Sequence, residues 1–293
     1  MNKLLILGGS GMLGSSLIAE CIVTKLPFEA PSSTSLDITN KKDVQSYISS
    51  HKPIAVVNCA AWTDVENSEI EFPKALKLNA DAVFNIAIAA KSVGVPVVHI
   101  STDYVFDGTK KEPYSEHDLT NPINSYGASK LQGERILMDI YPENSYVIRT
   151  SWLYAATGKN FVKSILKKAL SHQRIRVIQD QIGSPTNSED LARGITALLN
   201  TKLEAGIYHF SNEGKISWYE FATKIYNLAG TDVGLVEPID AHSYPSKVKR
   251  PDYSVLATEK WEKAEITQIV QWEDSLTKVF PKVLETVRKE ERS

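Results

Sequence analysis

The sequence predicts an α/β fold in which a doubly wound parallel sheet precedes a smaller C-terminal domain. Short apolar segments alternate with helical patterns along the first half of the chain, as in parallel sheets covered by helices on both faces. The first of these segments runs directly into a glycine-rich turn. Beyond about residue 155 the alternation loses its regularity, and long loops follow at 181–188 and 238–252. We therefore expect one large domain over residues 1–155 and a second over most of residues 156–293.

Six segments are expected to be strands, because they are short, apolar and bounded by turn-forming residues. They are Leu4–Leu7, Ile54–Asn58, Val95–Ser101, Tyr146–Thr150, Arg176–Gln179 and Gly206–Ser211. A further strand is expected near Phe28–Ala30, and the strand near 206–211 is expected to return to the first domain. Ligands of such sheets bind at the carboxyl ends of the strands. Cys59–Trp62 and Ser101–Tyr104 lie at such ends.

A glycine-rich turn, Gly8-Gly-Ser-Gly11-Met-Leu-Gly14, lies between the first expected strand and a helical pattern over Ser15–Thr24. In a dinucleotide-binding Rossmann domain, the first glycine permits a tight turn, the second lets the backbone approach a pyrophosphate, and the third allows close helix packing. The helix N-terminus then faces the anion. The spacing is GxxGxxG and not GxGxxG, and the alternative interpretation is a turn in an ordinary βα unit. The surrounding pattern favours a nucleotide cofactor.

Tyr126 and Lys130 lie four residues apart in an expected helix, so their side chains share one face. A free phenol has a pKa of about 10 and donates its proton slowly at neutral pH. A nearby ammonium favours the phenolate and brings the tyrosine toward the range in which acid-base catalysis is efficient. An exposed helix pair is the commoner meaning of this spacing. Together with the glycine-rich turn, the pair indicates a proton donor beside a nucleotide cofactor.

The composition argues against several classes of protein. With 293 residues, 42% of them apolar, the chain can bury a full core. Its 33 basic and 35 acidic residues are well mixed, and a formal charge of −2 offers no footprint for nucleic acid or an anionic membrane. Cys21 and Cys59 form neither a disulfide framework nor a metal-ligand spacing. The apolar start Leu4–Leu7 breaks at Gly8, and no span approaches transmembrane length. We expect a cytoplasmic protein that acts on a small molecule.

The chain resembles the extended short-chain dehydrogenase/reductases and, within them, the dTDP-4-dehydrorhamnose reductases. The resemblance runs nearly from end to end. The segments that carry it are Gly8–Gly14, Leu36–Thr39, Asn58–Thr63, Ser101–Gly108, Tyr126–Lys130, Arg149–Tyr154, Asp180–Thr186 and Arg250–Ser254. The first and fifth are typical of the whole superfamily, and the others point to the reductases.

The resemblance implies the last step of dTDP-L-rhamnose synthesis. In that step NADPH or NADH reduces the C4 ketone of dTDP-4-dehydro-L-rhamnose, a dTDP-linked 4-keto-6-deoxyhexose. By similarity, Tyr126 is the acid that protonates the forming C4 alkoxide, and Lys130 holds the nicotinamide ribose and lowers the tyrosine pKa. The Thr102 hydroxyl bonds the substrate carbonyl oxygen as hydride arrives. These three are the expected catalytic residues.

The resemblance also implies the binding residues. For the cofactor they are Gly8, Gly11, Met12, Leu13, Gly14, Asp37, Ile38, Cys59, Ala60, Ala61, Trp62, Asn79, Tyr126 and Lys130. For the substrate they are Thr102, Asp103, Tyr104, Trp152, Gln181 and Arg250. We expect Asp37 and Ile38 against the adenine, Asn79 in support of the catalytic lysine, and the Arg250 guanidinium on the nucleotide diphosphate.

Some of these residues have a second interpretation. Thr102 is also a β-forming residue at a strand end, and Trp152, expected beside the sugar, is also an ordinary core residue. Asp37 precedes Asn40–Asp43 as a possible helix cap, a meaning that is compatible with contact to the adenine.

The chain departs from the family at two places. Ser15 and Ser16 stand where some members carry an acidic residue that binds magnesium between subunits, so we expect no metal, and a monomer or homodimer. Pro31–Ser33 lacks the acidic residue that grips an NAD ribose, so we expect both cofactors to be used, with NADPH modestly preferred. Two other functions remain open. One is a noncatalytic protein like the regulatory subunit of methionine adenosyltransferase, and the other is a reductase that gives the talose epimer.

Overall fold

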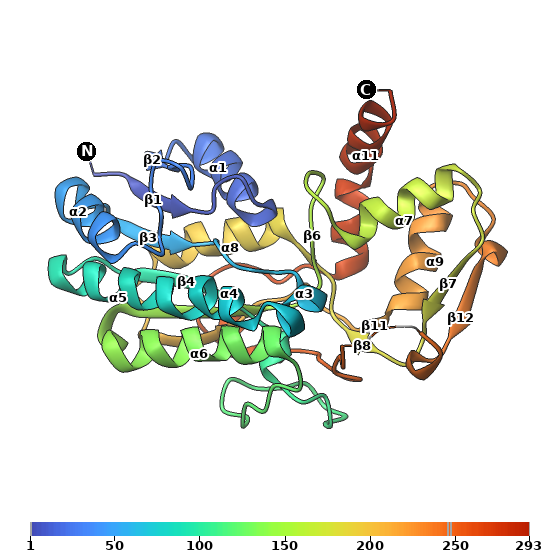
Figure 1. Cartoon of the computed structure of the whole chain (residues 1–293). Helices are drawn as coiled ribbons and strands as arrows, with labels where there is room; N and C mark the ends of the chain where they lie inside the picture. The colour runs from blue at the N-terminus through green and yellow to red at the C-terminus, as the bar shows by residue number, and fades with distance from the viewer. Residues whose placement is uncertain (1, 245, 247, 293) are drawn as a thin grey trace.

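The larger of two lobes is built on a six-stranded sheet (Figure 1). The computed structural model describes residues 2–244, 246 and 248–292. The strand order is β10-β5-β4-β3-β1-β2, and all neighbouring strands are parallel. The strands are β1 (Leu4–Leu7), β2 (Phe28–Glu29), β3 (Ala55–Asn58), β4 (Val97–Thr102), β5 (Ser145–Thr150) and β10 (Gly206–His209). The expected doubly wound parallel sheet is thus confirmed.

Side chains of these strands alternate between two apolar cores, one on each face of the sheet. Leu4 and Ile6 pack with helices α1 and α8 on one face, whereas Leu5 and Leu7 pack with α2 and α5 on the other. The helices of this lobe are α1 (Met12–Thr24), α2 (Lys41–His51), α3 (Val65–Ile70), α4 (Phe72–Leu76), α5 (Ala82–Val93), α6 (Ser125–Ile140), α8 (Ser188–Asn200) and α10 (Glu259–Lys263). Each fully buried leucine contributes roughly 1.5–3 kcal/mol. The two cores therefore hold the carboxyl edge of the sheet in place.

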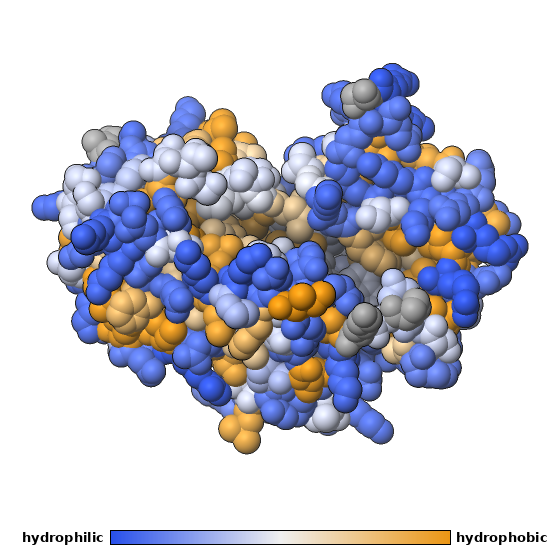
Figure 2. All heavy atoms as spheres, in the orientation of Figure 1, coloured by the Kyte–Doolittle hydropathy of each residue, from blue (hydrophilic) through white to orange (hydrophobic). Residues whose placement is uncertain are grey.

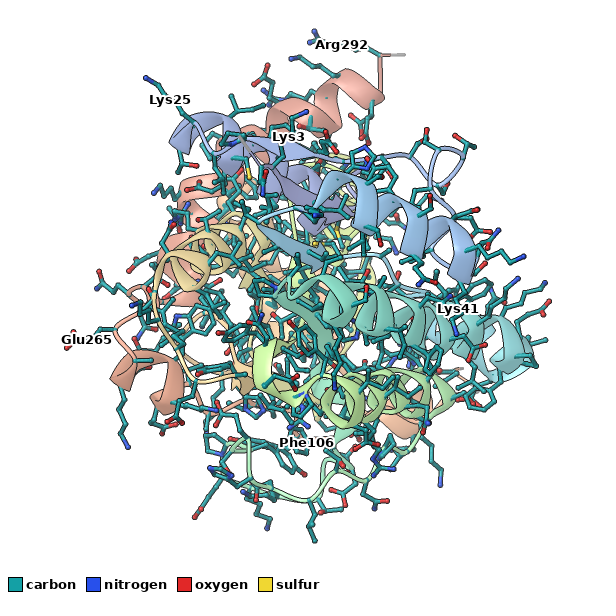
Figure 3. All side chains as sticks on the ribbon, turned by 90° about the vertical axis from the view of Figure 1, so that its left-hand side faces the viewer. Lys3, Lys25, Lys41, Phe106, Glu265 and Arg292 are labelled. Carbon is teal, nitrogen blue, oxygen red and sulfur yellow. The ribbon has the colours of Figure 1, made fainter. Side chains whose placement is uncertain are left out.

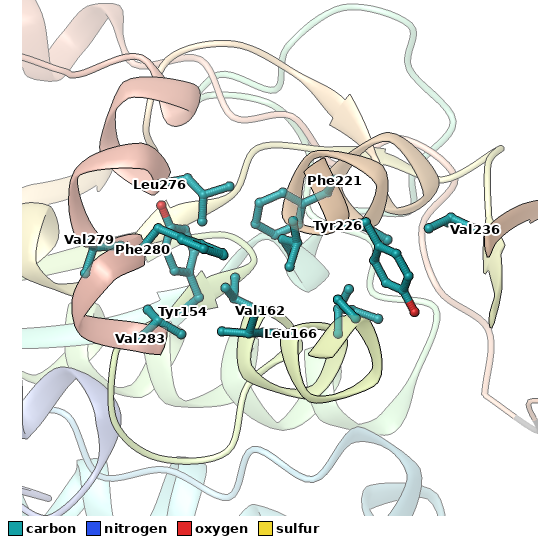
Figure 4. Close-up of a cluster of buried hydrophobic side chains, with 14 of the residues drawn as sticks. Tyr154, Val162, Leu166, Phe221, Tyr226, Val236, Leu276, Val279, Phe280 and Val283 are labelled. Carbon is teal, nitrogen blue, oxygen red and sulfur yellow. The ribbon is translucent and has the colours of Figure 1, made fainter. Parts of the chain in front are cut away.

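The second lobe has its own apolar core, shown in Figure 4, where Phe280 and Val162 point inward from different helices. Its helices are α7 (Phe161–Leu170), α9 (Trp218–Leu228) and α11 (Trp272–Glu290). Its strands pair as β7 (Ile175–Ile178) with β12 (Val236–Ile239), β6 (Leu153–Tyr154) with β9 (Thr186–Asn187), and β8 (Ile182–Gly183) with β11 (Ile216–Ser217). These short pairs position the loops that face the first lobe.

The chain passes between the lobes more than once. α8 and β10 come after the first elements of the second lobe, yet they pack with the first sheet, as Trp261 of α10 does. The strand expected near 206–211 is β10, and it pairs with β5. Segments on both sides of residue 155 therefore contribute to the first lobe. The expected division of the chain into two domains near this residue stays a prediction.

Three expectations about local structure were wrong. The expected loop 181–188 contains the strands β8 and β9, and the expected loop at 238–252 begins inside β12. Two-residue strands carry no readable alternation, so the pattern could not reveal them. The cap of α2 is Asn40, whose side chain accepts a hydrogen bond from the Lys42 amide. Asp37 instead accepts bonds from the amide and hydroxyl of Thr39, one turn too early to cap the helix.

A hollow separates the two lobes on the face shown in Figure 2. Among the described residues, no helix combines the length and the apolar character that crossing a membrane would need.

Candidate active site

A cavity of about 490 Å³ lies where the carboxyl ends of the central strands meet the glycine-rich turn. Its walls come from five segments distant in sequence: the turn itself, the chain after β3, the end of β4, helix α6 and the chain after β5. Ten of the expected site residues line it: Gly11, Met12, Leu13, Cys59, Ala61, Thr102, Asp103, Tyr126, Lys130 and Trp152. The other expected residues lie outside its lining.

The glycine turn has the close approaches that only glycine permits. Gly8 adopts φ +77°, and a Cβ there would lie 2.7 Å from the Ala60 amide nitrogen. A Cβ on Gly14 would lie 2.2 Å from the Gly8 carbonyl oxygen. Gly11 is the N-cap of α1 and offers no side chain to cap it. The first amides of α1 are therefore available to an anion at the helix N-terminus.

Lys130 is almost completely buried on α6. Its Nζ donates a 2.6 Å hydrogen bond to the Ile100 carbonyl oxygen and lies 3.4 Å from Nε2 of His99. Burial lowers the pKa of this lysine to about 8, because the charged form loses its hydration. The His99 ring is itself fixed from behind by Asn58, at 3.1 Å from Nδ1. Lys130 is thus held in one position beneath the cavity.

Tyr126 lies one helical turn before Lys130 and lines the same cavity. Burial raises the pKa of its phenol to about 12, although a hydrogen bond with Thr102 acts in the opposite direction. The structure therefore does not show the lowering by Lys130 that we expected. Desolvation is the largest cause of the raised pKa, and the ammonium of Lys130 is directed to the Ile100 carbonyl.

Thr102 and Asp103 form the floor of the cavity at the end of β4. The Thr102 hydroxyl donates to Asp103 Oδ1 at 3.0 Å and accepts from the Tyr104 amide at 3.2 Å. Burial raises the pKa of Asp103 to about 6, although hydrogen bonds from Ser254 and Thr102 act in the opposite direction. Within the described part of the chain, no group bonds Asp103 Oδ2 with good geometry. The Tyr104 ring packs edge-on against Tyr126, with 5.9 Å between centroids.

Asn79 acts on the site indirectly. Its amide accepts from the Trp62 amide at 2.8 Å, and it donates to the Trp62 carbonyl and to the Ser129 hydroxyl at 2.9 Å. Ser129 precedes Lys130 on α6, so Asn79 ties the helix to the chain after β3. The hydrogen bonds found for Lys130 do not include Asn79. Asn79 thus contacts the neighbour of Lys130 on α6, and its support of the lysine stays a prediction.

Gln181 and Arg250 line a different hollow, of about 460 Å³. The Arg250 guanidinium donates to Glu66 Oε1 and to the Ser246 hydroxyl, both at 2.7 Å. Glu66 belongs to α3 in the first lobe, so this ion pair bridges two distant parts of the chain. The guanidinium pairs here with the anionic oxygen of a carboxylate. Phosphate oxygens are anionic partners of the same kind.

Gly9 of the turn lies against Ala30, since a Cβ on Gly9 would come within 2.9 Å of the Ala30 Cβ. Ser32 follows, with its hydroxyl bonded to those of Thr34 and Ser35. The nearest carboxylate in sequence, Glu29, is instead paired with Lys3 at 2.7 Å. Lys25 extends into solvent from the far end of α1 (Figure 3). The positions of Asp37 and Ile38 against an adenine stay predictions.

No metal site emerges in the described ranges, where no three His, Cys, Asp or Glu side chains lie close enough to hold an ion. Ser15 donates its hydroxyl proton to the Met12 carbonyl, and the Ser16 hydroxyl bonds that of Ser188 at 2.7 Å. The Ser15 hydroxyl is thus used within α1, and that of Ser16 joins α1 to the start of α8.

Sequence reasoning missed two groups of residues at the cavity. Ser151, Gly158 and Lys159 line it, and a Cβ on Gly158 would lie 2.8 Å from Met12 Cγ. The sequence signal that marks the end of this loop is Asn160, because an asparagine before an amphipathic helix is a typical N-cap. Behind the cavity, Glu134 and Arg149 form a buried ion pair at 2.7 Å. No local sequence pattern predicts this pair.

The fold and the site together define an α/β nucleotide-binding protein of the short-chain dehydrogenase/reductase class, with a tyrosine and a lysine on one helix beside a glycine turn. Residues 1–285 match the family model described as RmlD substrate binding domain, and the chain belongs to this family.

Relatives of the chain support this assignment over nearly its whole length. It is 39% identical over 291 residues to the dTDP-4-dehydrorhamnose reductase of Aggregatibacter actinomycetemcomitans, covering 95% of this chain and 98% of the relative. It is 36% identical over 280 residues to a dTDP-4-keto-6-deoxy-D-glucose reductase of Streptomyces niveus, covering 96% and 97%. The crystal structure of the Bacillus anthracis dTDP-4-dehydrorhamnose reductase in complex with NADP superposes with a TM-score of 0.91 at 37% identity, covering 96% and 99%.

Proposed function

We propose that the protein reduces the C4 ketone of a dTDP-linked 4-keto-6-deoxyhexose with NADPH or NADH, and that its substrate is dTDP-4-dehydro-L-rhamnose. The observation that carries the proposal is one cavity lined by the glycine turn, Thr102, Tyr126 and Lys130. Membership of the family supports the reaction class. The two relatives named above act on different dTDP-linked sugars by their names, and both names describe reductases. The choice of rhamnose is therefore the finer part of the proposal.

The chain offers a nicotinamide dinucleotide a fitting site. Gly8 and Gly14 let the backbone of the turn pack closely on itself and on Ala60, and α1 presents uncapped amides to a pyrophosphate. When bound, the cofactor supplies a hydride to the C4 carbon. The Bacillus anthracis relative binds NADP, which supports the same cofactor here. The residues that we propose hold it are those of the turn, together with Cys59, Ala61 and Lys130.

The side chains at the cavity have separate chemical tasks. With a pKa of about 12, Tyr126 is fully protonated at neutral pH and has a proton to donate. The C4 alkoxide is a stronger base than a phenolate, so the proton passes to the substrate oxygen. Thr102 turns its hydroxyl proton from Asp103 Oδ1 to that oxygen as negative charge develops. The ammonium of Lys130 would donate to the ribose hydroxyls of a bound cofactor and so help to hold it beside Tyr126.

We further propose that the substrate spans both hollows. The sugar lies in the larger cavity near Thr102 and Trp152, and the nucleotide end reaches the second, near Gln181 and Arg250. Arg250 then exchanges the Glu66 carboxylate for the diphosphate, which its guanidinium binds with two parallel hydrogen bonds. A monomer or homodimer suffices for this arrangement, because all the proposed residues lie in one chain.

The direct test is to incubate the purified protein with NADPH and dTDP-4-dehydro-L-rhamnose and to identify the product by NMR. We expect dTDP-L-rhamnose. The talose epimer would show that hydride reaches the opposite face. A protein that binds NADPH but consumes neither keto sugar, this one or dTDP-4-keto-6-deoxy-D-glucose, would instead be a noncatalytic subunit.

A further inference from the structure

The indole of Trp152 lies in the wall of the candidate active site in an unusual backbone conformation. Trp152 lines the cavity that also holds Thr102 and Tyr126. Its φ is +46°, in the left-handed region that bulky side chains rarely adopt. Such a conformation persists only where the surroundings enforce it, and it clusters at functional sites. The contacts that enforce it are therefore informative.

Two residues of the second lobe lie against the indole. Trp218, the first residue of α9, stacks on Trp152 with ring centroids 3.5 Å apart and planes 8° from parallel. Gly183 of β8 lies against the ring, since a Cβ there would come 2.4 Å from Trp152 Cε2. Any side chain at position 183 would displace the indole. The ring thus has little freedom to change its rotamer.

The two enclosing residues form one local unit. Gly183 pairs with Ile216 in the antiparallel ladder of β8 and β11, and Trp218 comes two residues after Ile216. The start of α9 is fixed by a capping box between Ser217 and Glu220. The unit is anchored in the second lobe, because Trp218 also packs against Phe161 at 4.5 Å between centroids.

We propose that Trp218 and Gly183 are positioning residues that clamp the Trp152 indole, so that the second lobe fixes the place of the sugar ring relative to Tyr126. This inference rests on the proposed function. It predicts that the clamp acts on the affinity for the sugar nucleotide and leaves cofactor binding unchanged, because neither Trp218 nor Gly183 is among the residues that line the cavity with the glycine turn. Two stacked indoles also give an exciton-coupled band in the far-ultraviolet circular dichroism, which reports the clamp directly.

The test compares Trp218→Leu, Trp218→Phe and Gly183→Ala with a matched control, Tyr219→Leu. Tyr219 is the next aromatic residue on α9, is partly buried against the same core and has no ring contact with Trp152 among those found. For Trp218→Leu we expect loss of the exciton band and a rise in KM for dTDP-4-dehydro-L-rhamnose of about tenfold, the scale of 1.4 kcal/mol. Turnover and the Kd for NADPH should change by less than about threefold. Trp218→Phe should recover most of the KM, since it keeps a stacking ring.

Several results would overturn the clamp. One is a normal KM in Trp218→Leu despite loss of the exciton band, and another is an equal rise of KM in Tyr219→Leu. If Trp218→Leu does not fold, the test rests on Trp218→Phe and Gly183→Ala. The clamp then requires that Gly183→Ala raises the KM for the sugar nucleotide and alters the exciton band. A wild-type protein that reduces no keto sugar would refute the proposed function and the clamp together, whereas an active wild type with unaffected variants refutes the clamp alone.

Discussion

The Lys130 ammonium donates a 2.6 Å hydrogen bond to the carbonyl oxygen of Ile100, two residues before Thr102. This bond ties the helix that carries Tyr126 to the strand that carries Thr102, and a buried hydrogen bond from the Ser101 hydroxyl to Glu134 joins the same two elements. The lysine is also surrounded by groups that respond to its charge. His99 lies at 3.4 Å from Nζ, and Glu134 and Cys59 favour the charged form of the lysine.

The affinity for NADPH should depend on pH through Lys130. Its pKa is lowered to about 8 by burial, so the lysine is charged below pH 8 and loses its proton as the pH rises through 8. The charged form donates the stronger hydrogen bonds to the ribose. We therefore expect the Kd for NADPH to increase at pH values above 8. Fluorescence titration with NADPH at a series of pH values measures this increase. Lys130→Met should raise the Kd at pH 7, lower turnover and remove this pH dependence. If only turnover falls, the proposed ribose contact is wrong.

Asp103→Asn should stabilise the fold while it weakens catalysis. The pKa of Asp103 is raised from 3.8 to about 6, so the folded protein takes up a proton between pH 6 and pH 4 before the unfolded chain does. The contribution of this group to stability thus falls as the pH rises from 4 to 6. Two pKa units correspond to a cost on the order of 2–3 kcal/mol at pH 7. We expect the free energy of unfolding of Asp103→Asn to exceed that of the wild type at pH 7, and the two to converge near pH 4. If the free energies of unfolding of the two proteins differ equally at pH 7 and at pH 4, the ionisation of Asp103 is not the cause of the difference.

The preference between cofactors should be modest, with NADPH used up to about tenfold better than NADH in kcat/KM, or about 1.4 kcal/mol. Ser32, Thr34 and Ser35 offer hydroxyls to a 2′-phosphate, whereas Glu29 is paired with Lys3. Ser32→Asp should reverse the preference by placing a carboxylate near the phosphate, and Glu29→Gln should leave it unchanged. A hundredfold preference in the wild type would mean that another residue reads the ribose.

The parts of the molecule that the sequence could predict are local. The glycine turn and the Tyr126–Lys130 pair follow from spacing alone, and both line the cavity at Gly11, Tyr126 and Lys130. The direction of the tyrosine pKa could not be predicted, because burial is a property of the whole fold. The pairing of Arg250 with Glu66 joins residues 184 positions apart. No local sequence pattern can predict a contact between residues so far apart in the chain.

The short strands of the second lobe were missed for a related reason. β8 and β11 have two residues each, and their pairing brings Gly183 and Trp218 to Trp152 from 31 and 66 positions away. The sequence Gly183-Ser-Pro185 indicates a loop, and it does not reveal that a ring occupies the space of the absent side chain. The resemblance named Trp152 but not the residues that hold it.

The most direct test of the account is the turnover of Tyr126→Phe with NADPH and dTDP-4-dehydro-L-rhamnose. The change removes only the phenolic oxygen and keeps the ring that packs against Tyr104, so the fold and the Kd for NADPH should stay close to those of the wild type. We expect kcat to fall by roughly two to four orders of magnitude, the scale of a lost general acid. Turnover within about threefold of the wild type would show that Tyr126 does not donate the proton and would contradict the central claim.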